Sequence, residues 1–522
     1  MTTKKAPIAW SSLTEHVIKI TLYAAFVTHA VDSAKRSITA FSCIINSLAC
    51  LLSLWLVKGE VDTAVKRIRR HLPPGYLGLP VYHEISLLIR LARGGGLGLE
   101  DALKWYDTFF AQSFVGREVI VCGGLDDLTW LFNNDRKGRT EVSWPPAIGA
   151  LLGPWAVSNQ TGNYHRALRR LLEPYFAPKF VNNYLTIIDE TTRDELDAWS
   201  ATGNYVSANA FKMYALRLFY MSAFGTANEV VLASLHDDFK LWLGGFLSLT
   251  TLRIPGSSFD DVMKARDRIL TTVGRLIDEF AIENSEESER ARTTIIGRMI
   301  YGKDKDDNRM LTRDEIKDNV LTLIFAGHDT TYASISTLLY HLSQNPDAME
   351  ALVEEVTELS EPFLSDELRN VPVLNACIHE SWRMDPPVNG SFRKAVKDVE
   401  HKGFALAADT VFNYSTRMVT ADKSIYANPG TFDMRRFLPE DHPLYAADVD
   451  CGVDPFQGRS NYPVFGGGTH VCLGKAFEQL ELRVLAVRMA RHYKVEVRNP
   501  KKTFLPINAW DVEFKLTQRK KE

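Results

Sequence analysis

The sequence lacks the features that mark several common protein classes. Its six cysteines are scattered among 522 residues without a Cys-x-x-Cys pair, so neither a disulfide framework nor a zinc site is indicated. The formal net charge is −3, whereas nucleic-acid-binding domains are usually strongly basic. No internal repeat, low-complexity segment, flavin fingerprint or nicotinamide fingerprint is present. We expect a globular protein in a reducing compartment, with no nucleic-acid partner.

One long hydrophobic run lies near the N-terminus. Residues 38–57 carry no charge and are long enough to cross a bilayer core of ~30 Å at about 1.5 Å per residue. More basic residues follow this run than precede it, which predicts that the body of the chain is cytoplasmic. We expect residues 1–60 to form a single-pass membrane anchor, at the endoplasmic reticulum, although a buried core helix is an alternative. Whether the shorter run Val17 to Val31 also enters the membrane stays open.

A connector rich in proline and glycine follows. Residues 72–80 read LPPGYLGLP, a composition that disfavours helix and stiffens the chain. We therefore expect residues 61–80, which are first basic and then rich in proline and glycine, to be a hinge. The catalytic domain would cover residues 81–522, in which helical periodicity dominates.

The most unusual stretch is FGGGTHVCLG, Phe465–Gly474. Cys472 stands there in a loop of glycines and small residues, directly before a helical pattern. Glycines let a flat ligand approach the backbone, and a helix N-terminus favours a thiolate. These ten residues alone allow an inert buried cysteine, an anion-binding loop or a thiolate ligand to haem iron. The lack of a following Lys-Ser/Thr pair weighs against the anion-binding loop.

The longest helical signal runs from Thr312 to about Ser343. Thr312 and Glu315 form a capping box at its start, and Pro346 blocks its continuation. About thirty residues give a rod of ~45 Å, long enough to cross a domain.

The middle of this helix reads Ala326-Gly327-His328-Asp329-Thr330-Thr331. A glycine inside a helix costs ~1 kcal/mol relative to alanine, and the Thr330 hydroxyl can bond the Ala326 carbonyl and loosen the turn. A kinked core helix is one interpretation. An acid and a hydroxyl beside a loosened turn are better explained as a proton relay.

Weaker sequence signals accompany the Cys472 loop and the long helix. His165 and Arg169 share a helical face and would suit an anionic group, although a solvated charged face is the simpler interpretation. Glu380 and Arg383 are spaced to pair on one helical turn. Residues 432–437, FDMRRF, place arginine between aromatics, which favours a buried or stacked guanidinium. Strands are expected at 118–122, 493–497 and 512–516.

In this order the motifs resemble those of the cytochrome P-450 superfamily of haem-thiolate monooxygenases, from about residue 72 to the end. The family has a haem loop, an oxygen-activation motif, an E-x-x-R pair and an aromatic-Arg-Phe motif. They match Phe465–Gly474, Ala326–Thr330, Glu380–Arg383 and Arg436–Phe437. The resemblance implies a mainly α fold with a smaller β region, and haem b (iron protoporphyrin IX) as cofactor.

The resemblance also implies roles for single residues. Cys472 would be the metal ligand, in a haem-binding loop that also uses Phe465, Gly466, Gly468, His470 and Gly474. The haem propionates would be held by His165, Arg169, Arg393 and His470. Glu380, Arg383 and Arg436 would form a structural ion cluster. Asp329 would deliver protons from solvent, and Thr330 would hold the water that receives them. His470 departs from the commoner arginine, and its charge would depend on pH.

The implied activity is hydroxylation of a small apolar substrate with O2. Since no flavin or nicotinamide site is indicated, electrons would come from a membrane-bound, NADPH-dependent flavoprotein reductase. The Pro-Pro-Gly hinge, Ser143-Trp144-Pro145 and Ala326–Thr331 resemble the branch acting on sterols, retinoids and plant terpenoid hormones, so an isoprenoid-derived substrate is expected. Candidate pocket residues, each of which could instead be plain core, are Ile324, Phe325, Val388 and Trp510.

Two other functions are compatible with parts of this pattern. Enzymes of the same fold that rearrange or dehydrate peroxides need no external electrons, but they generally lack the pair formed here by Asp329 and Thr330. A non-enzymatic haem-binding membrane protein would need Cys472 but neither Asp329 nor Thr330. The presence of the pair favours the monooxygenase.

Overall fold

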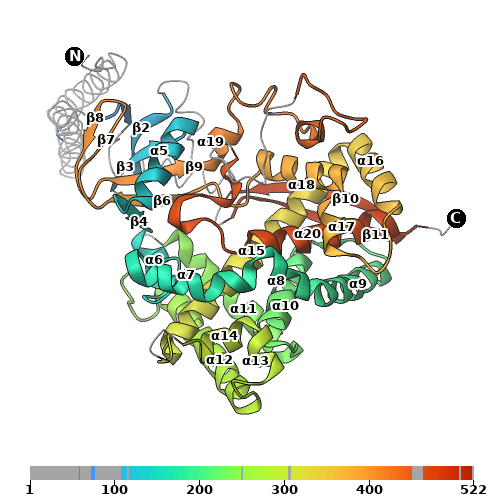
Figure 1. Ribbon diagram of the computed structural model, residues 1–522, viewed down its shortest axis with the longest axis horizontal. Helices are drawn as coiled ribbons and strands as arrows, with labels where there is room; N and C mark the ends of the chain where they lie inside the picture. The colour runs from blue at the N-terminus through green and yellow to red at the C-terminus, as the bar shows by residue number, and fades with distance from the viewer. Residues whose placement is uncertain are drawn as a thin grey trace, which may run out of the picture. The chain divides into compact units, whose positions relative to one another are not determined.

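A computed structural model describes residues 58, 72–76, 107–114, 117–248, 251–303, 307–449, 462–504 and 507–519 (Figure 1). The predicted span at 38–57, the run Val17 to Val31 and the predicted boundaries at residues 60 and 80 lie outside these ranges. Part of the predicted hinge is described, and Gly75–Tyr76 there form a short strand rather than a helix. Within the described ranges, no helix is both long and apolar enough to cross a membrane.

The chain divides into two compact units. The smaller comprises Met1–Glu141 and Phe392–Met418, and the larger comprises Val142–Ser391 and Val419–Glu522. Each unit therefore draws on segments that are far apart in the sequence.

Strands are found mainly in the smaller unit. In the described residues a six-stranded sheet has the order β1-β2-β3-β9-β6-β4, β7 pairs with β8, and the order β10-β11-β5 forms a three-stranded sheet in the larger unit. The strand bounds are β1 (Gly75–Tyr76), β2 (Phe109–Phe114), β3 (Arg117–Cys122), β4 (Thr140–Val142), β5 (Val206–Ser207), β6 (Gly390–Ala395), β7 (Val399–His401), β8 (Phe404–Leu406), β9 (Val411–Ser415), β10 (Tyr493–Thr503) and β11 (Ala509–Gln518). The three strands predicted from the sequence correspond to β3, β10 and β11.

Helices make up most of the larger unit (Figure 1). The α-helices are α5 (Leu125–Arg136), α6 (Pro146–Leu152), α7 (Gly162–Phe176), α8 (Pro178–Val181), α9 (Leu185–Ala201), α10 (Ala210–Phe224), α11 (Glu229–Leu243), α12 (Ser258–Glu283), α13 (Glu289–Thr293), α14 (Ile295–Tyr301), α15 (Arg313–Gln344), α16 (Pro346–Thr357), α17 (Ser365–Arg369), α18 (Pro372–Met384), α19 (Thr416–Thr420) and α20 (Lys475–His492). Short 3-10 turns are η1 (Asn182–Tyr184), η2 (Gly244–Leu247), η3 (Met434–Phe437), η4 (Pro463–Phe465) and η5 (Gly468–His470).

The long helix α15 matches its prediction closely. The Thr312 hydroxyl accepts the backbone N–H of Glu315, and the Glu315 carboxylate accepts the backbone N–H of Thr312, so the capping box is present. The helix ends at Gln344, and Pro346 begins α16.

The two halves of α15 belong to different hydrophobic clusters. Its first half, up to Ile324, packs with side chains from α11, α12 and α14. Its second half, from Tyr332, packs with side chains from α18, α20 and β11. Between them Ala326 is exposed, and Phe325, Gly327 and Thr330 are only half-buried. The stretch Phe325–Thr330, which we call the open stretch, therefore lies at the junction of the two clusters.

Candidate active site

Cys472 is held in a tight loop before α20. Its backbone N–H donates to the Phe465 carbonyl at 2.9 Å, which closes the loop. Gly466 and Gly468 have φ values of 71° and 74°, a conformation that residues with a Cβ rarely adopt. Gly474 then directly precedes the first turn of α20. Gly466 and Gly468 are therefore required by the shape of the loop.

Cys472 differs from the other described cysteines. Cys122 and Cys377 are buried, and burial raises the pKa of both thiols, which keeps them inert. Cys472 is exposed. The surrounding protein nevertheless reduces the solvation of its thiolate, and this effect, together with the charge of Glu478, raises the pKa of Cys472 to about 11, while the N–H of Gly474 donates to the sulfur and favours the thiolate. Cys472 is thus an accessible ligand whose charge a bound cation would have to stabilise.

Asp329 lies on α15 between two basic partners. Its carboxylate is 3.0 Å from the Nδ1 of His328 and 3.0 Å from the Nζ of Lys212 on α10, and its side chain is 3% exposed. Burial alone would raise the pKa of Asp329, but the hydrogen bond and charge of His328 and the charge of Lys212 outweigh it and lower the pKa. Asp329 is therefore a buried carboxylate that stays ionised near neutral pH.

Thr330 makes the hydrogen bond predicted from its spacing. Its hydroxyl donates to the Ala326 carbonyl within the open stretch. A Cβ added to Gly327 would meet only a Phe219 ring atom at 3.9 Å. The helix backbone is consequently accessible there, which is unusual for the middle of a helix whose two halves pack in hydrophobic clusters.

Thr331, the residue after the open stretch, links α15 to the first turn of α20, which follows the Cys472 loop. The Thr331 hydroxyl lies 3.0 Å from the carboxylate of Glu478, in the first turn of α20. That turn, from Gly474 to Glu478, is half-buried, whereas Gln479–Ala490 are buried. The contact between Thr331 and Glu478 therefore lies beside both the open stretch of α15 and the accessible first turn of α20.

Three of the predicted anion-binding residues meet at the loop. The rings of His165 and His470 are stacked, with centroids 4.0 Å apart. Arg169 donates to the Val471 carbonyl at 2.8 Å. The His470 Nε2 is 3.0 Å from the Gln160 carbonyl, an acceptor, so this nitrogen carries a proton. Arg393 belongs to the smaller unit.

Within the smaller unit, Arg393 is almost fully buried. Its Nε lies 3.5 Å from the Asp135 carboxylate, and its guanidinium lies over the ring of Tyr414. Its predicted contact with a haem propionate stays a prediction.

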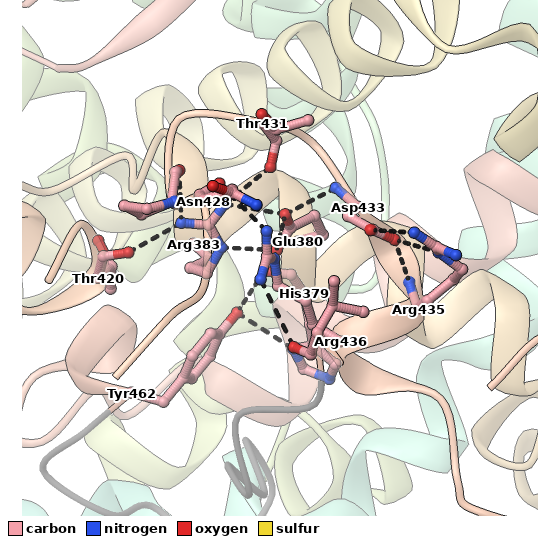
Figure 2. Close-up of polar contacts among 12 residues, drawn as sticks. His379, Glu380, Arg383, Thr420, Asn428, Thr431, Asp433, Arg435, Arg436 and Tyr462 are labelled. Atoms are coloured by element: carbon pink, nitrogen blue, oxygen red, sulfur yellow. Dashed lines mark hydrogen bonds and ion pairs between the residues drawn. The ribbon is translucent and has the colours of Figure 1, made fainter. Parts of the chain in front are cut away.

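Glu380, Arg383 and Arg436 form a buried ion cluster. Figure 2 shows both guanidinium groups converging on the Glu380 carboxylate, which accepts the Arg383 Nε at 2.6 Å and the Arg436 Nε at 3.2 Å. The Asp433 backbone N–H adds a further bond at 2.8 Å. The pairing predicted from the E-x-x-R spacing is therefore present, and Arg436 is the buried guanidinium expected between aromatics.

The cluster supports the loop through α18. The Tyr462 hydroxyl donates to the His379 carbonyl at 2.8 Å, and the ring of Phe465 packs on Trp382 with centroids 5.1 Å apart. Tyr462 and Phe465, which precede the glycines of the loop, therefore both contact α18, the helix that carries Glu380 and Arg383.

Comparison with known proteins decides the family. A sequence profile described as Cytochrome P450 matches residues 73–521. The chain belongs to the cytochrome P450 family. Putative cytochrome P450 120 of Synechocystis is 27% identical over 427 residues, covering 81% of this chain and 90% of the relative. Abscisic acid 8'-hydroxylase 4 of Arabidopsis thaliana is 23% identical, covering 87% and 92%.

A solved P450 structure agrees in fold. The structure of retinoic acid bound cyanobacterial CYP120A1 has a TM-score of 0.75 and 26% identity, covering 86% of this chain and 99% of that one. The mainly helical fold with a smaller sheet region is thereby confirmed. This P450 is an oxidoreductase, a monooxygenase that uses O2, an electron-transfer partner and an apolar substrate, and its cofactor is haem.

The described residues fit haem. An accessible thiol with a backbone N–H on its sulfur is a suitable ligand for iron, and a metal cation deprotonates a coordinating thiol. The room at Gly327 leaves space for a flat group against α15. His165, Arg169 and His470 place basic side chains at the loop, where anionic propionates would be held.

The four candidate pocket residues do not lie together. Ile324 is 1% exposed in the core, whereas Phe325 lies in the open stretch against Phe246 and Trp242. Val388 is 40% exposed. Trp510 stacks on Tyr340 at 3.7 Å between centroids, about 24 Å along α15 from Ile324. Contact with substrate stays a prediction for all four.

Trp510 belongs to a polar cluster around Asp385 that sequence reasoning missed. The buried Asp385 carboxylate accepts the Trp510 Nε1 at 2.9 Å and pairs with His341 at 2.9 Å and with Lys502. These partners come from α15, β10 and β11, so local spacing gives no signal for them. Burial would raise the pKa of Asp385, but His341 and Lys502 hold it well below its usual range.

We expect Asp385→Asn to lower the free energy of unfolding by about 3 kcal/mol at pH 7, because it breaks a buried charge pair. The folded-state pKa of Asp385 is depressed, so its contribution is full above the unfolded pKa of about 4 and is lost as pH falls below it. Urea unfolding of both proteins between about pH 7 and 3 should show the difference shrinking toward acid. A difference that grows toward acid would contradict the assignment.

Proposed function

We propose that this P450 is anchored in a membrane by residues 38–57 and hydroxylates a small apolar, isoprenoid-derived substrate. Its electrons come from an NADPH-dependent flavoprotein reductase, and its catalytic domain faces the cytoplasm at the endoplasmic reticulum. The observation that carries the catalytic part is the joint placement, in one unit, of the Cys472 loop and the open stretch of α15, tied by Thr331 and Glu478.

Cys472 is the ligand to iron in this proposal. Haem held by a thiolate supplies the oxygen activation, since the thiolate pushes electron density toward O–O cleavage. The Gly474 N–H that donates to the sulfur, and the positive charges of Arg169 and Lys475, favour the anionic ligand. His165, Arg169 and His470 orient the cofactor through its propionates.

Asp329 and Thr330 supply protons. Asp329 is ionised and bound to Lys212, whose side chain is 22% exposed, so a path from solvent reaches the buried carboxylate. Thr330 stands next in the chain, with its hydroxyl on the open side of α15. Asp329 would first take up a proton that arrives from solvent along Lys212, and a water held by Thr330 would then receive that proton and pass it to the oxygen being reduced. The contact of Lys212 was not predicted, because the sequence of α10 does not show that Asp329 packs against it.

Thr330→Ala should lower the amount of product formed per NADPH consumed several-fold, while haem binding is unchanged. The hydroxyl positions the proton-carrying water, and removing it lets reduced oxygen escape before product forms. Product and NADPH are measured in the same reaction with the purified reductase. Thr330→Ser is the matched control and should retain wild-type coupling. Equal coupling in wild type and Thr330→Ala would refute the relay.

The substrate class rests on the relatives. Retinoic acid, bound in the similar structure, and abscisic acid, in the name of the similar hydroxylase, both have isoprenoid carbon skeletons. A ligand that displaces water from haem shifts its absorption, so binding can be titrated optically. Retinoids, sterols, terpenoids and straight-chain fatty acids of matched length form the test panel. Binding confined to the fatty acids would overturn the isoprenoid assignment.

The anchor and the reductase have separate tests. The full-length protein should stay with membranes during extraction at high salt and alkaline pH, and its release would exclude a spanning anchor. Purified flavoprotein reductase with NADPH should reduce the haem in the presence of carbon monoxide. Reduction by an iron–sulfur donor alone would exclude that partner.

A further inference from the structure

Two carboxyl groups of α20 converge on one hydroxyl of α15. The Thr331 Oγ1 lies 3.0 Å from an oxygen of Glu478 and 3.2 Å from an oxygen of Glu481. A hydroxyl has one hydrogen to donate, so it satisfies only one carboxylate. The other carboxyl group can form a hydrogen bond with the Thr331 oxygen only if it donates. It must therefore carry a proton.

Neighbouring side chains indicate which carboxyl group accepts the hydrogen bond and which one donates. Trp382 on α18 donates its Nε1–H to the Ser334 hydroxyl at 2.9 Å, and the indole can act only as a donor. The Ser334 hydroxyl also bonds Glu478 and has its own hydrogen available for that carboxyl group. Glu478 is therefore the acceptor of two hydroxyl donors, Ser334 and Thr331, as suits a carboxylate.

The surroundings of Glu481 favour the neutral, protonated form. It is 2% exposed, whereas Glu478 is half-buried in the accessible first turn of α20. Within the described part of the chain, no lysine or arginine forms an ion pair with either carboxyl group, and the group facing Glu481 from α10 is the neutral phenol of Tyr214. Burial raises the pKa of both groups, and the charge of Glu478 raises that of Glu481 further.

We infer that Glu478 and Glu481 share a single proton through Thr331, that Glu481 is the neutral acid, and that Glu478 carries a fixed negative charge at the haem-binding loop. Each hydrogen bond then has one donor and one acceptor, from Glu481 to Thr331, from Thr331 to Glu478, and from Trp382 through Ser334 to Glu478. The part that concerns haem rests on the proposed role of Cys472.

The charge on Glu478 has a consequence for electron transfer. Glu478 lies in the turn that directly follows the Cys472 loop, and its charge is one of the causes that raise the pKa of the Cys472 thiol. A fixed negative charge at a half-buried site opposes the addition of an electron nearby. The charge of Glu478 would therefore favour the ferric form of the bound haem.

Two amide variants separate the members of the pair. Glu478→Gln keeps a carbonyl acceptor for Ser334 and Thr331 but removes the charge, so the reduction potential of the bound haem should rise. Glu481→Gln exchanges one neutral donor for another and should leave the potential unchanged. Potentiometric titration of the full-length holoprotein measures both. A shift in Glu481→Gln alone, equal shifts in both variants, or no shift in either would overturn the inference.

Infrared spectroscopy tests the proton itself. The C=O stretch of a protonated carboxyl group is distinct from carboxylate bands and moves in D2O. Wild type minus Glu481→Gln should contain such a band, whereas the band should persist in Glu478→Gln. Its absence from the first difference spectrum would overturn the shared proton.

A third variant covers the case in which Glu478→Gln fails to bind haem. Thr331→Val leaves both carboxyl groups in place but removes a donor from Glu478, which makes its charge less stable, so the potential should rise as well. Thr331→Ser retains the hydroxyl and should match wild type. An unchanged potential in Thr331→Val would overturn the inference.

The carbon monoxide spectrum keeps this inference separate from the proposed function. If all variants show the thiolate-type band while the potentials fail to differ, the shared proton is wrong and the role of Cys472 stands. If wild type itself lacks that band, the proposed function is wrong.

Discussion

Replacing Cys472 with histidine will move the absorption of the reduced, carbon-monoxide-bound protein away from ~450 nm and bring product formation below detection. The position of this band reports thiolate ligation. Histidine retains a ligand for iron, but a neutral imidazole does not push electron density toward O–O cleavage as a thiolate does. Haem binding and haem chemistry are therefore separated by this substitution. The measurement is the carbon monoxide difference spectrum of the reduced, purified protein. Product formation is then measured with reductase and a substrate found in the binding panel.

Cys377→Ser is the matched control for Cys472. Cys377 is fully buried in α18, and burial raises the pKa of its thiol, which makes it a poor ligand. We expect the band near ~450 nm to survive this change, with at most a modest loss of stability. If the band instead survives Cys472→His and is lost in Cys377→Ser, the ligand has been assigned to the wrong cysteine.

Glu380→Gln should lower the free energy of unfolding by about 3–5 kcal/mol, because it leaves two buried guanidinium groups without a counter-charge. Glu380 and Arg383 are completely buried, and Arg436 is nearly so. Since Tyr462 and Phe465 rest on the same helix α18, we also expect less haem to be retained at equal protein concentration. Chemical denaturation measures stability, and the ratio of haem absorbance to protein measures retention.

An exposed pair on α12 provides the comparison. Arg275 and Glu279 lie 2.7 Å apart, and both side chains are about half exposed. Glu279→Gln should change the free energy of unfolding by no more than about 0.5 kcal/mol, since exposed pairs one helical turn apart contribute little. Equal losses in Glu279→Gln and Glu380→Gln would mean that burial does not determine the strength of the cluster.

Local features were predictable because their causes are local. The capping box formed by Thr312 and Glu315 and the bond from Thr330 to Ala326 each join residues within one helical turn. The pair of Glu380 and Arg383 has the same origin, since residues three apart share a helical face. The glycines at 466 and 468 were read correctly as backbone requirements.

The partners of these residues were not predictable. Lys212 reaches Asp329 from α10, and Lys502 reaches Asp385 from β10. Spacing along one helix shows which side chains share a face, but not which other element packs on that face. The two carboxyl groups at Thr331 were missed for the same reason, because they are 147 and 150 residues away.

The sequence by itself determined the family, the iron ligand as a candidate and the bounds of α15, since each depends on residue types at short spacing. Only the tertiary structure decided which of the three cysteines in the described residues is accessible, that Asp329 is held as a carboxylate, and that Glu478 and Glu481 meet at a single hydroxyl. Accessibility and ionisation depend on burial and on distant charges, which arise when α10, α15, α18 and α20 pack together.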